Sequence, residues 1–259
     1  MSETDTPLSI GRVILTVNNL DVVSGFYENV IGLSLMDRDG ETALLGTGET
    51  PLIELRHDRL ARHHPGEAGL FHTAFLLPSR RDLGLWTRHI REFGVSLDGA
   101  SDHLVSEALY LRDPEGNGIE VYVDRPRPEW VRHGNDIKMA TEPLDLSDLT
   151  NVQGAWTGAP DGTVIGHVHL CVGDIETADR FMTGPLGLTR TSRWPSAGWY
   201  GSGGYHHQLA ANVWYSRGAE RRSPGSRGLA EIELLVQPET LPLGPMEDPW
   251  GTQFTIALA

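Results

Sequence analysis

Cysteine is almost absent from this chain, because Cys171 is the only one among its 259 residues. A single cysteine excludes an internal disulfide framework and a metal site built from several thiolates. Any transition metal would therefore be held by imidazole and carboxylate groups, and the chain contains 11 histidines and 35 acidic residues. The composition thus restricts metal chemistry to nitrogen and oxygen ligands.

Long apolar runs and positive charge are also scarce. Runs such as Val13–Val17 are far too short to cross a bilayer, and the first residues, MSETDTPLSIGR, are acidic where a signal peptide is basic. We therefore expect no membrane role and a cytoplasmic location. Only 21 basic residues oppose the 35 acidic ones, for a net charge of -14. Nucleic acid is a poor partner, since affinity for its phosphates comes chiefly from lysine and arginine.

An internal repeat organises the chain. A first unit, IGRVILTVNNLDVVSGFYENVIGLSL from Ile10, returns as IGHVHLCVGDIETADRFMTGPLGLTR from Ile165. A second unit follows each first unit. Its two copies begin with GLFHTAFLLP at Gly69 and RGLAEIELLVQP at Arg227, and they end with DPEGNGIEVYV at Asp113 and DPWGTQFTIAL at Asp248. The sequence therefore contains four related modules.

Each module is predicted to hold a strand, then a helix, then further strands. Alternating apolar residues predict first strands at VILTV and HTAFLL, and the spacing of apolar residues predicts helices over Asp21–Val30 and Arg80–Phe93. The dense turn signal DPEGNG separates two further strands, Ala108–Leu111 and Ile119–Val123. In the last module only Pro238–Glu247 lies between the first strand and the final turn, so we expect this module to be eroded to three strands.

The length suits two modest domains or one large one, and the composition favours two. Residues 1–125 would form a first domain from modules 1 and 2, and residues 163–259 a second from modules 3 and 4. Residues 126–162, rich in Pro, Asp, Gly and Thr, are predicted to be a linker wrapped on the surface.

The repeat, the helix pattern SGFYENVIGL and the paired DPxG turns resemble the vicinal oxygen chelate superfamily, which includes glyoxalase I, bleomycin-resistance proteins and extradiol ring-cleaving dioxygenases. More narrowly, DHLVSEALYLRDPEGNGIEVYVDRP from Asp102, IGHVHLCV and GGYHHQLAANVW are similar to stretches of two-domain bacterial catechol-2,3-dioxygenases. The resemblance covers nearly the whole chain outside the linker. It implies an α+β fold in which tandem βαβββ modules pair into cups of β-sheet, with a metal on the first and last strands.

The resemblance also implies where metal ligands lie. The first-strand positions are Ile14, His72, His169 and Glu231, and the final-strand positions of modules 2 and 4 are Glu120 and Thr255. Pairing module 2 with module 3 would unite His72, Glu120 and His169, two histidines and a carboxylate, which suits iron(II), with manganese(II) as the alternative. The cup of modules 1 and 4 is predicted to be metal-free, because Ile14 and Thr255 are poor ligands.

Three further residues are expected near the metal by the same resemblance, and His207 is the alternative to one of them, His206. Tyr110 lies ten residues before Glu120, as an active-site tyrosine does in extradiol enzymes. The alignment favours His206 as acid-base catalyst. Only one of His206 and His207 can point into the cup, because adjacent side chains on a strand face opposite ways. His103 would be a second polar group at the mouth of the cup. His207 and His167 are expected to be the outward members of their pairs.

The hypothesis that follows is an extradiol dioxygenase that opens a small aromatic diol with dioxygen. Two other functions stay open from the sequence: a glyoxalase-like or isomerase metalloenzyme, and a non-catalytic protein that binds an aromatic ligand such as an antibiotic. Trp194, Trp199 and Trp214 are candidates either for a pocket wall or for the core of the second domain. Assembly into a homo-oligomer is a further open alternative.

Overall fold

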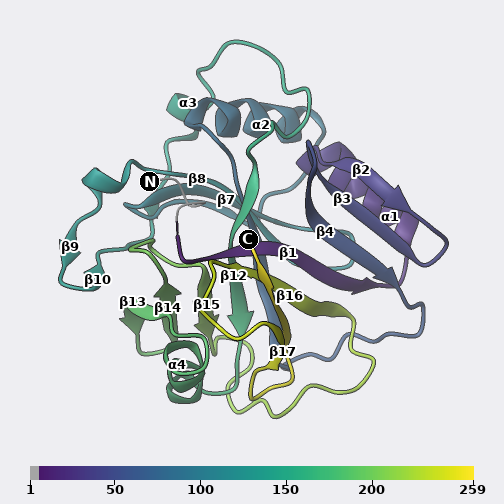
Figure 1. The fold of residues 1–259 in the computed structure, drawn as a ribbon. Helices are drawn as coiled ribbons and strands as arrows, with labels where there is room; N and C mark the ends of the chain where they lie inside the picture. The colour runs from purple at the N-terminus through teal and green to yellow at the C-terminus, as the bar shows by residue number, and fades with distance from the viewer. Residues whose placement is uncertain (1–5) are drawn as a thin grey trace.

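The computed structural model describes residues 6–259 and contains two large β-sheets with helices outside them. Figure 1 shows helices α2 and α4 on opposite sides of the molecule, with strands between them. Modules 1, 2 and 3 each have the order strand, helix, three strands, and module 4 has three strands. The predicted α+β fold of tandem βαβββ modules with an eroded last module is therefore confirmed.

Each sheet combines two modules that are far apart in the sequence. The seven-stranded sheet has the order β17-β18-β16-β1-β4-β3-β2, from modules 1 and 4. Its strands are β1 (Leu8–Val17), β2 (Ser34–Arg38), β3 (Thr42–Thr47), β4 (Thr50–His57), β16 (Gly228–Val236), β17 (Gly244–Glu247) and β18 (Gln253–Leu258).

The nine-stranded sheet unites modules 2 and 3, in the order β11-β6-β7-β8-β5-β12-β15-β14-β13. Its strands are β5 (Gly69–Leu76), β6 (Gly99–Asp102), β7 (Ser106–Arg112), β8 (Gly118–Asp124), β11 (Glu142–Pro143), β12 (Val164–Cys171), β13 (Thr189–Trp194), β14 (Ala197–Gly201) and β15 (Leu209–Asn212). The central contact is the antiparallel pair of β5 and β12, so the predicted meeting of module 2 with module 3 is confirmed. Both sheets contain strands from residues 1–125 and from residues 163–259. The division of the chain into two domains at these bounds stays a prediction.

The helices begin at side chains that accept hydrogen bonds from exposed backbone amides. Asn19, Ser79 and Asp174 cap α1 (Leu20–Phe26), α2 (Arg80–Glu92) and α4 (Ile175–Thr183) in this way. Helix α1 continues into the π-helix η2 (Tyr27–Ile31). Helix α2 buries Leu83, Leu85, Trp86 and Ile90, as its spacing predicts. None of the helices within residues 6–259 has the length and apolar content needed to traverse a bilayer.

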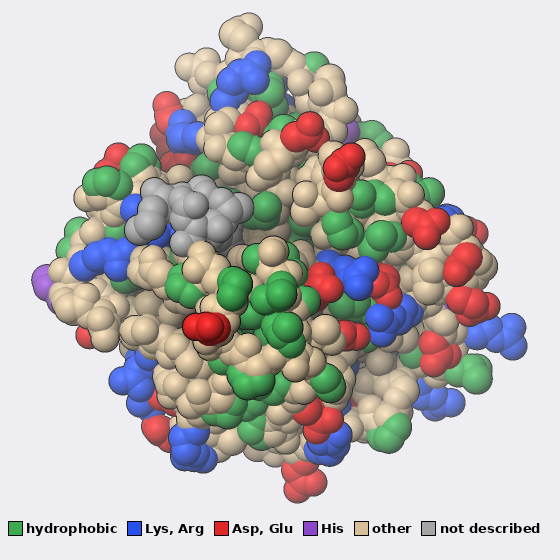
Figure 2. Space-filling model, in the orientation of Figure 1, with side chains coloured by type: hydrophobic (Ala, Val, Ile, Leu, Met, Phe, Trp, Pro, Cys, Tyr) green, Lys and Arg blue, Asp and Glu red, His purple; other side chains and the backbone are tan. Residues whose placement is uncertain are grey.

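The linker contains short elements and returns to the body of the protein. It forms η3 (Arg127–Glu129), the hairpin of β9 (Arg132–His133) and β10 (Asp136–Ile137), strand β11, and helix α3 (Leu146–Leu149). Strand β11 pairs with β6 at the edge of the nine-stranded sheet. Figure 2 shows acidic and basic side chains interspersed over the face in view, with no continuous basic patch among its described side chains.

Candidate metal centre

One row of residues crosses the nine-stranded sheet and assembles the polar centre. His167 on β12 lies opposite Ala74 on β5, Ala74 lies beside Glu120 on β8, and Glu120 lies opposite Tyr110 on β7. Ala74 is fully buried and too small to fill the space above it. The side chains of His167 and Glu120 can therefore meet across the alanine. His72 comes from the neighbouring row and reaches both.

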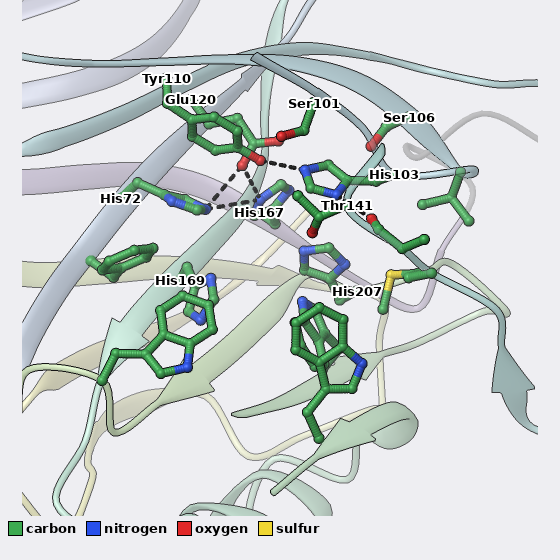
Figure 3. Close-up of a pocket in the computed structure, with 17 residues that line it drawn as sticks. His72, Ser101, His103, Ser106, Tyr110, Glu120, Thr141, His167, His169 and His207 are labelled. Carbon is green, nitrogen blue, oxygen red and sulfur yellow. Dashed lines mark hydrogen bonds and ion pairs between the residues drawn. The ribbon is translucent and has the colours of Figure 1, made fainter. Parts of the chain in front are cut away.

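Three donor atoms form a small triangle at this point. Glu120 Oε2 lies 3.0 Å from His72 Nε2 and 3.2 Å from His167 Nε2, and the two Nε2 atoms are 3.3 Å apart. The three residues are between 2% and 6% exposed. Within residues 6–259, their side chains form a group of potential ligands close enough together to hold a metal ion. Figure 3 shows the three side chains pointing toward one another at one end of the pocket.

The donor set fits a metal ion. With metal–ligand bonds of about 2.1 Å, two ligand atoms at right angles lie about 3.0 Å apart, close to the observed sides of the triangle. A buried carboxylate also requires a positive partner, because transfer of a charge out of water is costly. Two imidazoles and one carboxylate on one side of an ion leave its other side open to the pocket, as in the facial triad of non-heme iron sites.

Burial sets the protonation of the group. Burial alone would raise the pKa of the Glu120 carboxyl, but charge interaction with His167 and hydrogen bonds from His167 and His72 hold this pKa well below its ordinary value. Burial lowers the pKa of His167 to about 4, against the opposing effect of Glu120. Glu120 is therefore ionised and His167 neutral near pH 7, which is the form in which each binds a metal.

The structure differs from the sequence analysis at the third ligand position. His169, the expected residue, lies in the row of His72 rather than that of Glu120. Asn212 Oδ1 accepts from the Trp214 backbone amide, so Asn212 Nδ2 donates to His169 Nε2 at 3.0 Å. The lone pair of that nitrogen is therefore occupied. His169 still lines the pocket, but the triangle contains His167 in its place.

The expectation that His167 faces outward is wrong, and alternation along the strand explains why. Residues two apart on a strand share one face, so His167 and His169 point the same way. Both are buried. A signal for the correct choice was present in the sequence, since aligning FHTAFLL with GHVHLCV places His72 opposite His167.

The choice between His206 and His207 is also corrected. His207 lines the pocket, whereas His206 is fully buried behind it and bonds Asp124 through Nε2 at 2.8 Å. The favoured alignment of His206 with the catalytic position is therefore not supported by the geometry. Burial, and then the neighbouring His167, lower the pKa of His207 well below its ordinary value, so its imidazole is neutral near pH 7.

Tyr110 and His103 lie together on the pocket wall beside Glu120. The Ala140 carbonyl can only accept, so His103 donates to it through Nδ1 at 2.7 Å. The other ring nitrogen of His103 lies 2.6 Å from the Tyr110 hydroxyl oxygen, which also hydrogen-bonds Glu120. Burial, and then the charge of Glu120, raise the pKa of Tyr110 well above its ordinary value. The phenol is therefore protonated near pH 7.

A pocket of about 250 Å³ opens in front of the triangle. Trp194, Trp199 and Trp214 all line it, together with Phe71, and ring centroids lie 5.1 Å apart in both the Phe71–Trp214 pair and the Trp194–Trp199 pair. Residues 139–141 of the predicted linker also line the pocket, and Met139 packs against the cluster that contains Trp199. The remaining lining residues are Ser101, Val105 and Ser106 with the polar groups already described. The shape suits a flat, largely apolar ligand with polar groups at one end.

The other sheet holds ion pairs at the positions that match this centre. Arg12 stands where the repeat places His167, and its guanidinium lies 3.1 Å from Glu54. Thr255 donates to Glu231 at 2.5 Å, and Glu231 also lies 3.5 Å from Arg56. Arginine side chains therefore neutralise Glu54 and Glu231 in this sheet.

Three comparisons with known proteins agree with this description. Residues 9–121 match the model of the Glyoxalase/Bleomycin resistance protein/Dioxygenase superfamily. The chain is 39% identical over 236 residues to a catechol-2,3-dioxygenase of Bacillus subtilis, covering 88% of this chain and 82% of that protein.

Solved structures give the same fold across the whole chain. The crystal structure of a protein from Bacillus subtilis that is described as a dioxygenase superposes with a TM-score of 0.64 at 15% identity. The match covers 98% of this chain and 85% of that chain. Glyoxalase I from Zea mays gives a TM-score of 0.57 at 16% identity, with 99% and 94% covered. At these identities the likeness concerns the fold alone.

Proposed function

The chain belongs to the glyoxalase, bleomycin resistance protein and dioxygenase superfamily, and from this premise we propose that it is an extradiol dioxygenase of catechols. The reaction would insert both atoms of dioxygen as the ring carbon bond beside the diol breaks. The observation that carries the proposal is the buried triangle of His72, Glu120 and His167 at the end of an aromatic pocket.

His72, Glu120 and His167 would hold the metal, for which we propose iron(II), with manganese(II) as the alternative. When bound, this ion would supply the Lewis acidity and redox chemistry that the reaction of a catechol with dioxygen requires. The nitrogen and oxygen donors suit both ions, and their softness separates the two only weakly. Ionised Glu120 would neutralise part of the charge of the ion inside the protein.

The aromatic side chains would bind and orient the ring of the substrate. Phe71 and Trp214 meet edge to face on one side of the pocket, and Trp199 with Trp194 forms another wall. These surfaces offer a flat slot that excludes water from the reacting end. The two hydroxyls of the diol would then lie toward the triangle, because the polar lining groups gather there.

Tyr110 and His207 would handle protons and hydrogen bonds at the diol. Protonated Tyr110 is tied to His103, so its hydroxyl oxygen is presented to the pocket at a fixed position. His207 is neutral, and an imidazole in this form can accept a proton from a substrate hydroxyl. Tyr110 would thus fix the position of a substrate oxygen, and His207 would take up the substrate proton.

The alternative functions are less well supported by the site. A glyoxalase-like metalloenzyme usually has four ligands with two carboxylates, whereas the group found within residues 6–259 has one carboxylate. A purely sequestering protein would not need an ionised glutamate between two imidazoles, which is costly unless a cation is present.

The proposal is tested by loading the protein with iron(II) and adding catechol and substituted catechols in air. We expect a yellow ring-opened product with equimolar oxygen uptake, and no product under strict anaerobiosis. Inactivity toward every catechol despite a full equivalent of iron would reject the dioxygenase, and an isomerase activity that persists without oxygen would favour the glyoxalase-like alternative.

A further inference from the structure

A chain of hydrogen bonds leads from Asp124 to the pocket. Asp124 Oδ1 lies 2.8 Å from His206 Nε2, and His206 Nδ1 lies 2.7 Å from His207 Nδ1. His206 is fully buried between the Tyr205 ring at 4.1 Å and the Trp130 ring at 5.1 Å, whereas His207 lines the pocket. The side chain of Asp124 is 23% exposed, so the chain runs from the pocket wall to the surface.

The direction of each hydrogen bond follows from what each atom can donate. An ionised carboxylate only accepts, so the hydrogen in the first bond belongs to His206 Nε2. Where His206 carries a single hydrogen, its Nδ1 has a lone pair and accepts from His207 Nδ1 at 2.7 Å, whereas a doubly protonated His206 would donate from both nitrogens. His207 Nε2 is then left without a hydrogen, and it bonds no other group within residues 6–259.

We propose that Asp124 acts through His206 as a positioning residue that fixes His207 in the tautomer with its hydrogen on Nδ1 and a bare Nε2 for the pocket. The two histidines alone could hydrogen-bond equally well in the reverse direction. In that arrangement His206 donates from Nδ1, and His207 carries its hydrogen on Nε2. The carboxylate of Asp124 is the group that distinguishes the two arrangements, because it requires the hydrogen of His206 to be on Nε2.

The consequence for the pocket is an acceptor in place of a donor. A His207 Nε2 without a hydrogen accepts a hydrogen bond from a ligand hydroxyl. In the reverse tautomer this nitrogen carries a hydrogen, so it cannot accept one. This consequence for a catechol rests on the proposed function, whereas the tautomer itself does not. The two can therefore be tested separately.

The decisive variant is Asp124→Asn, because the amide has nearly the shape of the carboxylate and can donate to His206 Nε2. Donation there reverses the chain, as the Asp-to-Asn change does in the serine protease triad. Asp98→Asn is the matched control, since it removes the same charge from a carboxylate that bonds Arg112 at 2.8 Å on the surface. Asp124→Glu restores a carboxylate.

The tautomer is measured by 15N NMR of histidine-labelled full-length protein loaded with diamagnetic zinc, with His207 assigned from His207→Gln. We expect a protonated Nδ1 and a bare Nε2 in the unaltered protein and in Asp98→Asn, and the reverse in Asp124→Asn. A protonated Nε2 in the unaltered protein would overturn the proposal, and this result is decisive even if the Asn variant does not fold. An unchanged tautomer in a folded Asp124→Asn protein would also overturn it.

Kinetics supply the second readout. With iron and catechol, Asp124→Asn should lower kcat by about 10- to 100-fold with bound metal unchanged, the range for partners that orient a functional group from behind. KM should change much less, and Asp124→Glu should recover part of kcat. An effect on KM alone would reject the positioning role. Inactivity of every protein, including the unaltered one, would reject the proposed function and leave the NMR result to decide the tautomer.

Discussion

Glu120 is the side chain whose environment most restricts the chemistry of the pocket. It is 3% exposed and lies within 3.2 Å of two imidazole nitrogens. Removing one partner of such a buried group leaves a charge without compensation, which is strongly unfavourable. Single substitutions around Glu120 can therefore show whether a residue binds the metal or only lines the pocket.

His167 and His169 provide a matched pair for this purpose, since they lie on one strand and one face. We expect His167→Ala to weaken iron binding by at least about 100-fold, because it removes an atom of the triangle. His169→Ala should change iron affinity by less than about tenfold, because the Nε2 atom of His169 already accepts from Asn212. Metal content after dialysis and isothermal titration measure both. Equal losses in the two variants would contradict the assignment of His167.

Cys171 gives a residue-scale prediction that is independent of the metal. Burial raises the pKa of its thiol to about 11, so about one thiol in a thousand is ionised at pH 8. Since the thiolate is the reactive form, the native protein should react with a disulfide reagent far more slowly than the urea-unfolded protein. The native rate should rise about tenfold for each pH unit up to about pH 11. A native rate that equals the unfolded rate at pH 8 would show that the thiol is accessible.

At the scale of elements, the close approach of β8 to β5 sets the distance between Glu120 and His72. Gly118 begins β8, and a Cβ atom there would lie 1.9 Å from the backbone oxygen of Phe71. A backbone atom cannot turn aside as a flexible side chain can, so a larger residue must push the strands apart. The glycine therefore controls the geometry of the triangle from two residues away.

Gly118→Ala should lower stability by about 1 to 3 kcal/mol, the usual cost of overpacking, and weaken iron binding as well. For a chain of this size the melting temperature should fall by about 2 to 10 °C. Gly40→Ala is the control, because nothing lies within 4 Å of its added methyl group, and it should leave stability nearly unchanged. Thermal unfolding of the metal-free proteins and metal titration measure the effects. A melting temperature and an iron affinity of Gly118→Ala equal to those of the unaltered protein would refute the close approach of β8 to β5.

At the scale of the whole molecule, each sheet combines strands from an earlier and a later segment of the chain. Strand β1 pairs with β16, and β5 pairs with β12. The metal triangle accordingly takes two residues from module 2 and one from module 3. A segment that ends at residue 125 would expose the edges of β1 and β5, which favours association with other chains.

We expect a fragment of residues 1–125 to bind less than about a tenth of an equivalent of iron, because His167 is missing from it. Co-expression with residues 126–259 should restore a complex that binds one equivalent. Size-exclusion chromatography and metal analysis measure these outcomes. An isolated fragment that is monomeric and binds iron as tightly as the full chain would contradict the shared sheets.

The sequence by itself determined the four modules, the nitrogen and oxygen character of the site, and the pairing of His72 with Glu120 in one module. The modules follow from the repeat in the sequence and the donor character follows from residue type, whereas the pairing of His72 with Glu120 follows from the family resemblance. The tertiary structure decided that His167 rather than His169 meets Glu120, that His207 rather than His206 faces the pocket, and that residues 139–141 form a wall.

The physical reason lies in the register between strands. Alternation shows which side chains of β12 share a face, but hydrogen bonds to β5 decide that His167, and not His169, stands opposite Ala74 in the row of Glu120. That pairing joins segments about ninety residues apart, and irregularities in the ladder on both sides of the two histidines shift it. Sequence periodicity has no information about such an offset, and only the assembled sheet supplies it.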